Sequence, residues 1–388
     1  MLRGAILAMF ALAMTGLAHA QALHPLPRQP VGLAWPTQQW AEAPLPSDVD
    51  QATLDLAITN AFGASDGPMG ETRAVLVVQG GRIVFERYND GYTRDTRLVS
   101  WSMGKSITHA LVGAAVLQNR VNIDAPMGNP HWPAGDRRAS IPWRTFLQFT
   151  DGLDYTESSA NVVHAGNARM LFGDGRMDVA AWAAARPLIH DPGTHWNYSS
   201  ATTILISDAL TRAIVPNPHD VNDRRTRMRA WMQSSLFDQI GMHPLVEFDP
   251  QGVFYGSSLF WATARDYARF GYLYLRNGVW DRTRVLPEGW VDFARTPGPA
   301  RNTDTYGAQF WLTAARGPGV PRSLITDNAL SDAFSAQGYE GQLIVIVPSK
   351  DLIMVRLGRM TGDTDTNWNA LGDWATQVVG AFGRRPAR

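Results

Sequence analysis

Val99-Ser100-Trp101-Ser102-Met103-Gly104-Lys105-Ser106 opens a helical pattern that runs to about Asn119. The run 110–117 within it is small and apolar on nearly every side, which is typical of a helix buried at the centre of a protein. Ser102 and Lys105 are three positions apart, so their side chains share one face of this helix. Ser102 also stands at the start of the helix, where unpaired backbone N–H groups and the helix dipole favour a developing negative charge.

Lysine occurs at only two positions, Lys105 and Lys350, whereas the other 33 basic residues are Arg. Arg does not release its proton near neutral pH, but a desolvated Lys does. A lysine beside Ser102 therefore suggests a site that needs a removable proton, with Lys105 as the base that activates the serine. Lys350 falls in a predicted turn, where we expect a solvated surface charge. A serine three residues before a lysine also arises by chance. Whether Ser102 and Lys105 form a catalytic motif therefore depends on the other motifs in the sequence.

The first twenty residues predict a secretory signal peptide. Arg3 supplies the positive start, residues 5–17 are apolar and uncharged, and Ala18-His19-Ala20 fits a cleavage site. The alternative is an uncleaved membrane anchor. We therefore expect an exported protein, periplasmic or secreted, without a membrane span once residues 1–20 are removed.

Composition excludes several classes of function. Removing residues 1–20 leaves 34 basic and 35 acidic residues, so there is no basic excess for binding nucleic acid. The chain has no Cys, which excludes disulfides and thiol chemistry. Its nine His lack the spacing of metal ligands, so we predict no metal and no cofactor.

Strand patterns lie near both ends of the chain and helical patterns lie between them. After a Pro-rich extension at 21–55, we predict one domain at 56–388, with a sheet part at about 70–100 and 300–388 and a helical part at about 101–300. The predicted strands are 74–78, 83–88, 342–347 and 352–358, and the predicted helices include 47–61, 199–213, 263–276 and 367–382. Strand 74–78 is apolar on both faces, so we expect its sheet to be covered on both sides. Ser47 and Thr263 are the expected caps of helices 47–61 and 263–276. The expected fold class is mixed α/β (α+β), an antiparallel sheet flanked by helices with an inserted helical subdomain.

A second candidate segment lies near the start of a later predicted helix. Asp191-Pro192-Gly193-Thr194-His195-Trp196-Asn197-Tyr198-Ser199-Ser200 reads as a turn, a short extended run and a helix capped by Ser199 or Ser200. Tyr198 alone is more often a packing residue. Beside a charged Lys105, however, the pKa of its phenol would fall and the group could carry protons.

A third candidate segment, Ala336-Gln337-Gly338-Tyr339-Glu340-Gly341-Gln342, leads into a predicted strand. Its two glycines allow a ligand to approach the backbone, so an N–H group here could stabilise an oxyanion. The alternative is an ordinary turn before a strand.

Together these three segments resemble the serine β-lactamase and penicillin-recognising family. The likeness is greatest to its class C-like branch, which includes esterases, D-aminopeptidases and 6-aminohexanoate-dimer hydrolases. The similarity spans about residues 70–385 and includes two further segments, 146–153 and 263–270. The resemblance implies a β-lactamase/transpeptidase-like fold.

The resemblance also implies roles for individual residues. Ser102 would be the acylated nucleophile, Lys105 its general base and Tyr198 the group that relays the proton. The backbone N–H groups of Ser102 and Tyr339 would form the oxyanion hole. Residues expected to contact substrate are Tyr155, Ser200, Gln337 and Gly338.

Two departures from the family pattern weaken the case for penicillin recognition. Ser200 stands where the middle motif commonly has Asn, and Ala336 followed by Gln337 stands where β-lactam-processing members have Lys or His. We therefore expect an exported serine hydrolase of small ester or amide substrates, closer to the 6-aminohexanoate-dimer hydrolases. The alternatives are β-lactamase or D-Ala peptidase activity, and a catalytically silent binding or sensor module. The substrate depends on pocket walls expected at 156–180 and 297–333, and the oligomeric state is open.

Overall fold

The computed structural model describes residues 23–63, 65–158, 161, 164–313, 332–362 and 364–385. The predicted signal peptide, residues 1–20, lies outside the described residues, as do residues 314–331 of the predicted pocket wall.

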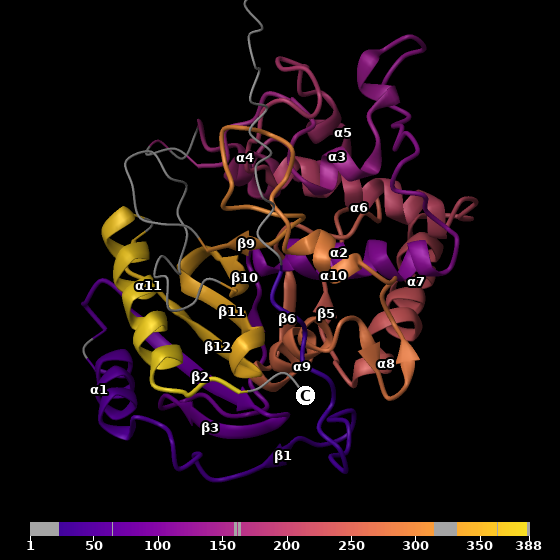
Figure 1. Cartoon of the computed structure of the whole chain (residues 1–388). Coiled ribbons are helices and arrows are strands. Elements are labelled where there is room, and N and C mark those ends of the chain that lie inside the picture. Colours follow the sequence, from indigo (N-terminus) through magenta and orange to yellow (C-terminus); the bar gives the residue numbers. More distant parts are fainter. Residues whose placement is uncertain are drawn as a thin grey trace, which may run out of the picture.

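A sheet of seven strands forms the centre of the fold (Figure 1). Its neighbouring strands pair antiparallel, except that the short edge strand β1 runs parallel to β3. Across the sheet the order is β1 (Ala41–Glu42), β3 (Arg82–Tyr88), β2 (Glu71–Gln79), β12 (Leu352–Arg359), β11 (Gln342–Val347), β10 (Phe334–Gly338) and β9 (Trp311–Leu312). The predicted sheet built from both ends of the chain is confirmed, since β2 and β12 are neighbours.

The hairpin between β2 and β3 follows from its sequence. Gly80 and Gly81 have φ of 58° and 76°, and positive φ at both central residues matches the twist of a two-residue hairpin. Strand β2 is buried on both faces because its apolar residues do not alternate with polar ones. Each face therefore needs a covering layer of helices.

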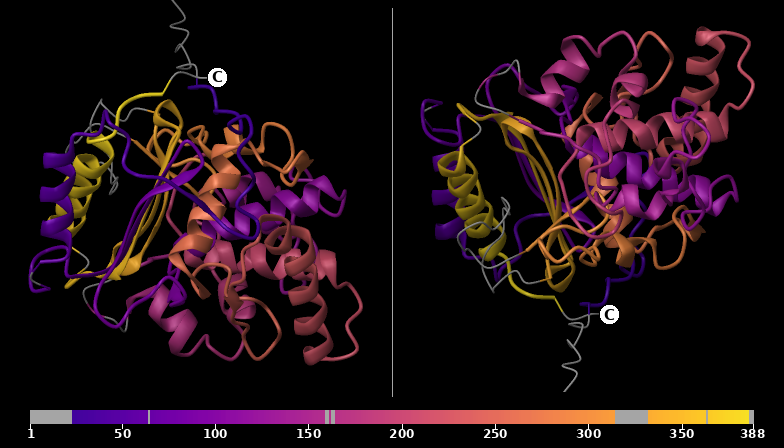
Figure 2. Two further views of the ribbon diagram at one scale, coloured as in Figure 1. Left: turned by 90° about the horizontal axis from the view of Figure 1, so that it is seen from below. Right: turned by 90° about the horizontal axis from the view of Figure 1, so that it is seen from above.

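Two helical layers cover the sheet (Figure 2). Helices α1 (Gln51–Ala61) and α11 (Asp365–Gly380) pack on the face that carries Val75 and Val77. Helices α2 (Met103–Leu117) and α9 (Ala264–Leu275) pack on the face that carries Leu76 and Val78. The alternation of strand side chains thus divides the apolar residues into two cores.

The part of the chain between β3 and β9 consists mainly of helices and loops, as predicted, and lies to one side of the sheet (Figure 1). Its further helices are α3 (Trp143–Leu147), α4 (Gly166–Phe172), α5 (Val179–Ala184), α6 (Ser200–Ile214), α7 (Val221–Met232), α8 (Asp238–Ile240) and α10 (Trp290–Ala294). This part also contains two small sheets. One consists of β4 (Leu98–Val99), β6 (Phe260–Ala262) and β5 (Leu245–Val246), in that order, and the other of β7 (Val279–Trp280) and β8 (Thr283–Arg284).

Helix α2 lies between the sheet and the helical part. Every residue from Met103 to Ala115 is buried, which confirms the predicted central helix. It contacts α6 on one side and β10 on the other. Because Ser102 is the N-cap residue of α2, the first turn of α2 lies where the three candidate segments can meet.

Two expectations about local structure are wrong. Lys350 is only 7% exposed and donates a hydrogen bond to the carbonyl of Phe382. The chain end after α11 covers this turn, so Lys350 is not a solvated charge, and burial lowers the pKa of its amine. Helix α1 is capped by Asp50, whose carboxylate accepts from Thr53 N–H, and not by Ser47.

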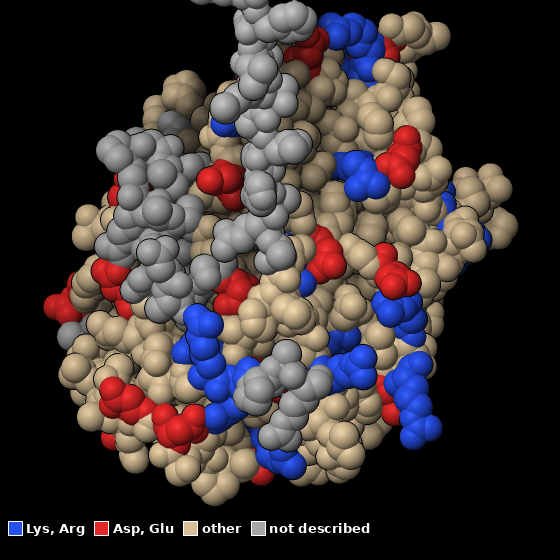
Figure 3. Space-filling model, in the orientation of Figure 1, with Lys and Arg blue, Asp and Glu red and all other residues tan. Residues whose placement is uncertain are grey.

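On the face shown in Figure 3, acidic and basic side chains are interspersed. Among the described residues, no helix is long and apolar enough to cross a membrane.

Candidate active site

Lys105 is the central polar group of the site. Its Nζ donates hydrogen bonds to Ser102 Oγ at 2.9 Å, Ser200 Oγ at 2.8 Å and Ser257 O at 3.2 Å. The side chain is 1% exposed. Burial lowers the pKa of the amine to about 8, although the negative charge of Glu157 raises it in part. Near neutral pH a useful fraction of Lys105 is thus unprotonated, with a lone pair free to accept the Ser102 proton.

Tyr198 lies beside this amine. Lys105 Nζ is 4.9 Å from the centre of the Tyr198 ring, so the cation faces the aromatic π-system. Trp311 stacks on the same ring, with centroids 5.2 Å apart. Ser199 caps α6 by accepting from Thr202 N–H, which fixes the chain direction just after Tyr198. The structure therefore brings Ser102, Lys105 and Tyr198 together.

Glu157 lies in the predicted pocket wall 156–180 and lines a cavity at Ser102, but sequence reasoning did not single it out as a site residue. Its carboxylate accepts hydrogen bonds from Ser200 N–H at 2.7 Å and from Ser200 Oγ at 2.6 Å. Ser200 thus accepts from Lys105 and donates to Glu157, which links the amine to a carboxylate through one hydroxyl. Glu157 precedes α4 in an irregular segment, where no periodicity marked it as a site residue.

The end of β10 lies against the segment that carries the nucleophile. A Cβ added to Gly338 would be 2.3 Å from Ser100 O and 3.1 Å from Ser102 N, so only glycine permits this approach. Tyr339 follows directly in the chain. The two expected oxyanion donors, the N–H groups of Ser102 and Tyr339, therefore belong to segments in contact.

A cavity of about 320 Å³ opens at Ser102. Of the expected substrate contacts, Gln337 and Gly338 line it, whereas Ser200 lies behind it against Lys105 and Glu157. Its described lining consists of Ser102, Glu157, Ser158, Asn167, Tyr198, Trp311, Gln337, Gly338, Tyr339 and Trp368. Glu157 is the single charged residue in this described lining, so the cavity presents negative charge and aromatic surface.

Tyr155 does not line this cavity. Its side chain is buried, and its ring packs edge-on against Trp182 with centroids 6.4 Å apart. Its carbonyl accepts from Asn197 Nδ2 at 2.8 Å. Tyr155 thus supports the segment before Glu157, and its contact with substrate stays a prediction. The described part of the chain contains no group of three or more His, Asp or Glu suited to a metal ion.

Comparison with known proteins gives a consistent set of relatives. Residues 69–370 match the family model for Beta-lactamase. Protein Rv1367c of Mycobacterium tuberculosis is 32% identical over 257 residues, which is 57% of this chain and 62% of that protein. The chain thus matches less than two thirds of that relative's length. A 6-aminohexanoate-dimer hydrolase of Paenarthrobacter ureafaciens is 24% identical, over 77% of this chain and 76% of that one.

Solved structures share the fold. A Bacillus anthracis protein assigned as a 6-aminohexanoate-dimer hydrolase has a TM-score of 0.67 at 18% identity, covering 92% of this chain and 90% of that chain. A class C β-lactamase from Rhodobacter sphaeroides has a TM-score of 0.56 at 16% identity, covering 84% of this chain and 99% of that chain.

Proposed function

This chain belongs to the beta-lactamase family, and we propose that it is a serine hydrolase that cleaves an ester or amide bond through an acyl-enzyme on Ser102. The observation that carries the proposal is the hydrogen bond of 2.9 Å between Lys105 Nζ and Ser102 Oγ. A buried amine with a pKa of about 8 supplies the base that a serine nucleophile requires.

In the proposed reaction, neutral Lys105 accepts the Ser102 proton while Oγ attacks the substrate carbonyl carbon. The N–H groups of Ser102 and Tyr339 stabilise the oxyanion. The proton then passes by way of Lys105 and Tyr198 to the leaving oxygen or nitrogen as the carbon–heteroatom bond breaks. Water attacks the resulting ester of Ser102 by the same route in reverse, which releases the acid and restores the free hydroxyl.

The charge of the cavity supports a substrate without a carboxylate near the reacting bond. Glu157 supplies negative charge, and no Lys, Arg or His is among the described lining residues. A β-lactam or a D-Ala peptide brings a carboxylate that would face Glu157 with no cation among the described lining residues. We therefore favour an ester or amide without a carboxylate beside the reacting bond, and a 6-aminohexanoate-dimer hydrolase is among the relatives. Export follows as a proposal from the signal-like residues 1–20.

Two substrates assayed side by side test this preference. We expect a short-chain nitrophenyl ester to be hydrolysed with kcat/KM at least about 100-fold above that for a chromogenic cephalosporin, because the cephalosporin carboxylate meets like charge from Glu157. This ratio corresponds to about 2.7 kcal/mol. Steady-state kinetics on the mature chain measure both. Faster cephalosporin turnover would make the protein a β-lactamase. Binding of the ester without turnover would favour the silent binding module.

Glu157 should set the pH range of acylation. Its charge raises the pKa of Lys105 against the effect of burial, so Glu157→Gln should lower this pKa. Because the neutral amine is the active form, the acid limb of the kcat/KM profile should move to lower pH from its wild-type position near pH 8. The exposed Asp154 in the same segment offers a control, because the solvent screens its charge and Asp154→Asn should leave the limb in place. A limb that stays or moves upward in Glu157→Gln would refute the electrostatic role.

A further inference from the structure

Each expected oxyanion donor has a non-glycine neighbour in a strained backbone conformation. Trp101, directly before Ser102, has a φ of 42°, and Glu340, directly after Tyr339, has a φ of 61°. Residues other than glycine rarely adopt a positive φ, because their Cβ then comes too close to a backbone carbonyl oxygen. Such strain persists where the surroundings hold it in place, and it is frequent at functional sites.

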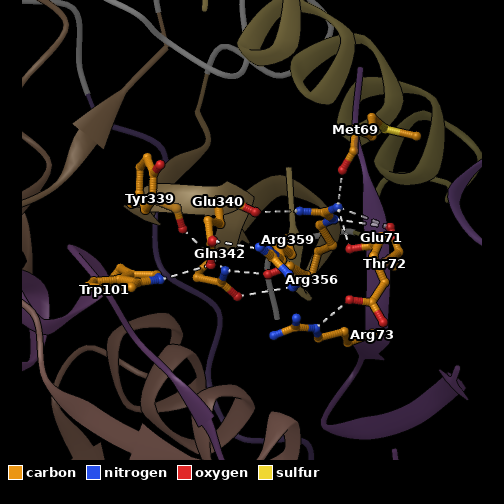
Figure 4. A network of polar contacts seen from close by, with 11 residues as sticks. Met69, Glu71, Thr72, Arg73, Trp101, Tyr339, Glu340, Gln342, Arg356 and Arg359 are labelled. Carbon is orange, nitrogen blue, oxygen red and sulfur yellow. Dashed lines mark hydrogen bonds and ion pairs between the residues drawn. The ribbon is translucent and has the colours of Figure 1, made fainter. Parts of the chain in front are cut away.

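The side chains of these two strained residues meet. Trp101 Nε1–H donates to Glu340 Oε2 at 3.2 Å, across 239 positions of the sequence (Figure 4). The Trp101 ring also contacts the Tyr339 ring edge-on, with centroids 5.7 Å apart. One side-chain pair therefore joins the segment of the nucleophile to the turn that carries the second donor.

The backbone of the turn is anchored on its other side. The buried guanidinium of Arg356 on β12 donates to Glu340 O at 3.1 Å and to Gly341 O at 2.8 Å. It also reaches Met69 O at 2.7 Å, next to β2. Gln342 Nε2 donates to Tyr339 O at 3.2 Å (Figure 4). The sheet thus fixes the carbonyls of the turn, which leaves the Glu340 side chain to reach the nucleophile segment.

We propose that Trp101 and Glu340 act as a positioning pair, which fixes the spacing of the Ser102 and Tyr339 N–H groups in the oxyanion hole. The inference rests on the proposed function of Ser102. Neither side chain needs to touch the reacting atoms. The effect is on geometry, because an oxyanion hole is effective only when its donors already point to the position that the oxyanion will occupy.

Glu340→Gly separates this positioning role from a structural one. Glycine accepts positive φ without strain, so the melting temperature should stay the same or rise. Loss of the Trp101 hydrogen bond should lower kcat for ester hydrolysis by about 10- to 100-fold, which is less than the loss on removing a whole oxyanion donor. KM should change by less than about threefold, because the bond matters most in the transition state. A purely structural residue would show the reverse, with lower stability and little change in kcat.

Two matched variants complete the test. Glu340→Gln keeps an amide oxygen as acceptor for Trp101 Nε1–H, and it should restore kcat to within about threefold of wild type. Trp101→Phe removes the Nε1–H donor together with part of the ring that contacts Tyr339, and it should lower kcat at least as much as Glu340→Gly does. The double variant Trp101→Phe/Glu340→Gly should be no slower than the slower single variant, because both break the same hydrogen bond. Glu340 Oε1 also lies 3.7 Å from Arg359 Nε, and Glu340→Gln, which loses this ion pair as Glu340→Gly does, controls for its loss.

Wild-type kcat in Glu340→Gly, an equal loss in Glu340→Gln, or additive losses in the double variant would overturn the inference. Hydrogen exchange of the Trp101 indole N–H, assigned by its disappearance in Trp101→Phe, tests the contact without turnover. We expect slow exchange in wild type and in Glu340→Gln, and fast exchange in Glu340→Gly. Equal exchange rates in all three proteins would refute the positioning pair. A wild-type protein that hydrolyses no ester would instead refute the proposed function, and the exchange rates would then test the Trp101–Glu340 contact alone.

Discussion

Lys105→Arg is expected to lower the rate of Ser102 acylation by about 1,000-fold or more, within the range lost when a general base is removed. A guanidinium keeps the positive charge near Ser102 and Ser200 but cannot give up its proton near neutral pH. Lys105→Met, of similar length and without charge, should be equally inactive. The rate of covalent labelling by a fluorophosphonate, followed by intact mass, measures acylation directly. A loss below about tenfold in either variant would show that Lys105 is not the base.

The same pair of variants also reports on stability. The folded-state pKa of Lys105 is about 8, below its ordinary 10.5. Between pH 8 and 10.5 the amine is protonated in the unfolded chain but neutral in the folded chain. The free-energy cost of burying a charged amine therefore lowers the stability of the wild type at low pH and disappears as the pH rises. The unfolding free energy of Lys105→Met relative to wild type should therefore be highest below pH 8 and fall by about 1.4 kcal/mol per pH unit between pH 8 and 10.5. A folded, inactive Lys105→Met would exclude unfolding as the cause of lost activity.

Gly338→Ala is expected to have the second largest effect, a loss of at least about 100-fold in kcat/KM for ester hydrolysis. The φ of Gly338 is −134°, so the alanine backbone is unstrained. The new Cβ would instead lie 2.3 Å from Ser100 O and 3.1 Å from Ser102 N. Relief of this clash has to move β10 away from the nucleophile segment, which separates the two oxyanion donors and costs about 1–3 kcal/mol of stability.

Gly380→Ala is the matched control for that substitution. Gly380 is the last residue of α11, and a Cβ there meets nothing within 4 Å. Alanine is the better helix former, so stability should stay level or rise slightly, with unchanged ester hydrolysis. Activity of Gly338→Ala within threefold of wild type would show that the close approach of β10 does not set the oxyanion geometry.

Local patterns were sufficient for much of the fold and for the centre of the site. The continuous apolar run of β2 predicted a sheet covered on both faces, and both cores contain its side chains. The spacing of Ser102 and Lys105 predicted their contact, because three positions along a helix fix relative direction whatever surrounds them. Thr263 likewise caps α9 as predicted, through a hydrogen bond within four residues.

Features that depend on distant parts of the chain were not predictable. Glu157 reaches Ser200 across 43 positions from a segment without periodicity. Lys350 is buried because the chain end at Phe382 returns over its turn, 32 positions later. The contact between Trp101 and Glu340 joins the segment before α2 to the turn between β10 and β11, 239 positions later. In each case tertiary packing decided the environment of a side chain whose local sequence indicated only a loop or a turn.

Covalent labelling of the wild-type chain with a fluorophosphonate, mapped by peptide mass spectrometry, tests the proposed acyl-enzyme chemistry most directly. Because the proposed base Lys105 contacts Ser102, which lines the cavity, we predict a single phosphonyl adduct, on the peptide that contains Ser102, and none in Ser102→Ala. A folded wild-type protein that stays unlabelled, or an adduct on another residue, would contradict the assignment of Ser102 as the nucleophile.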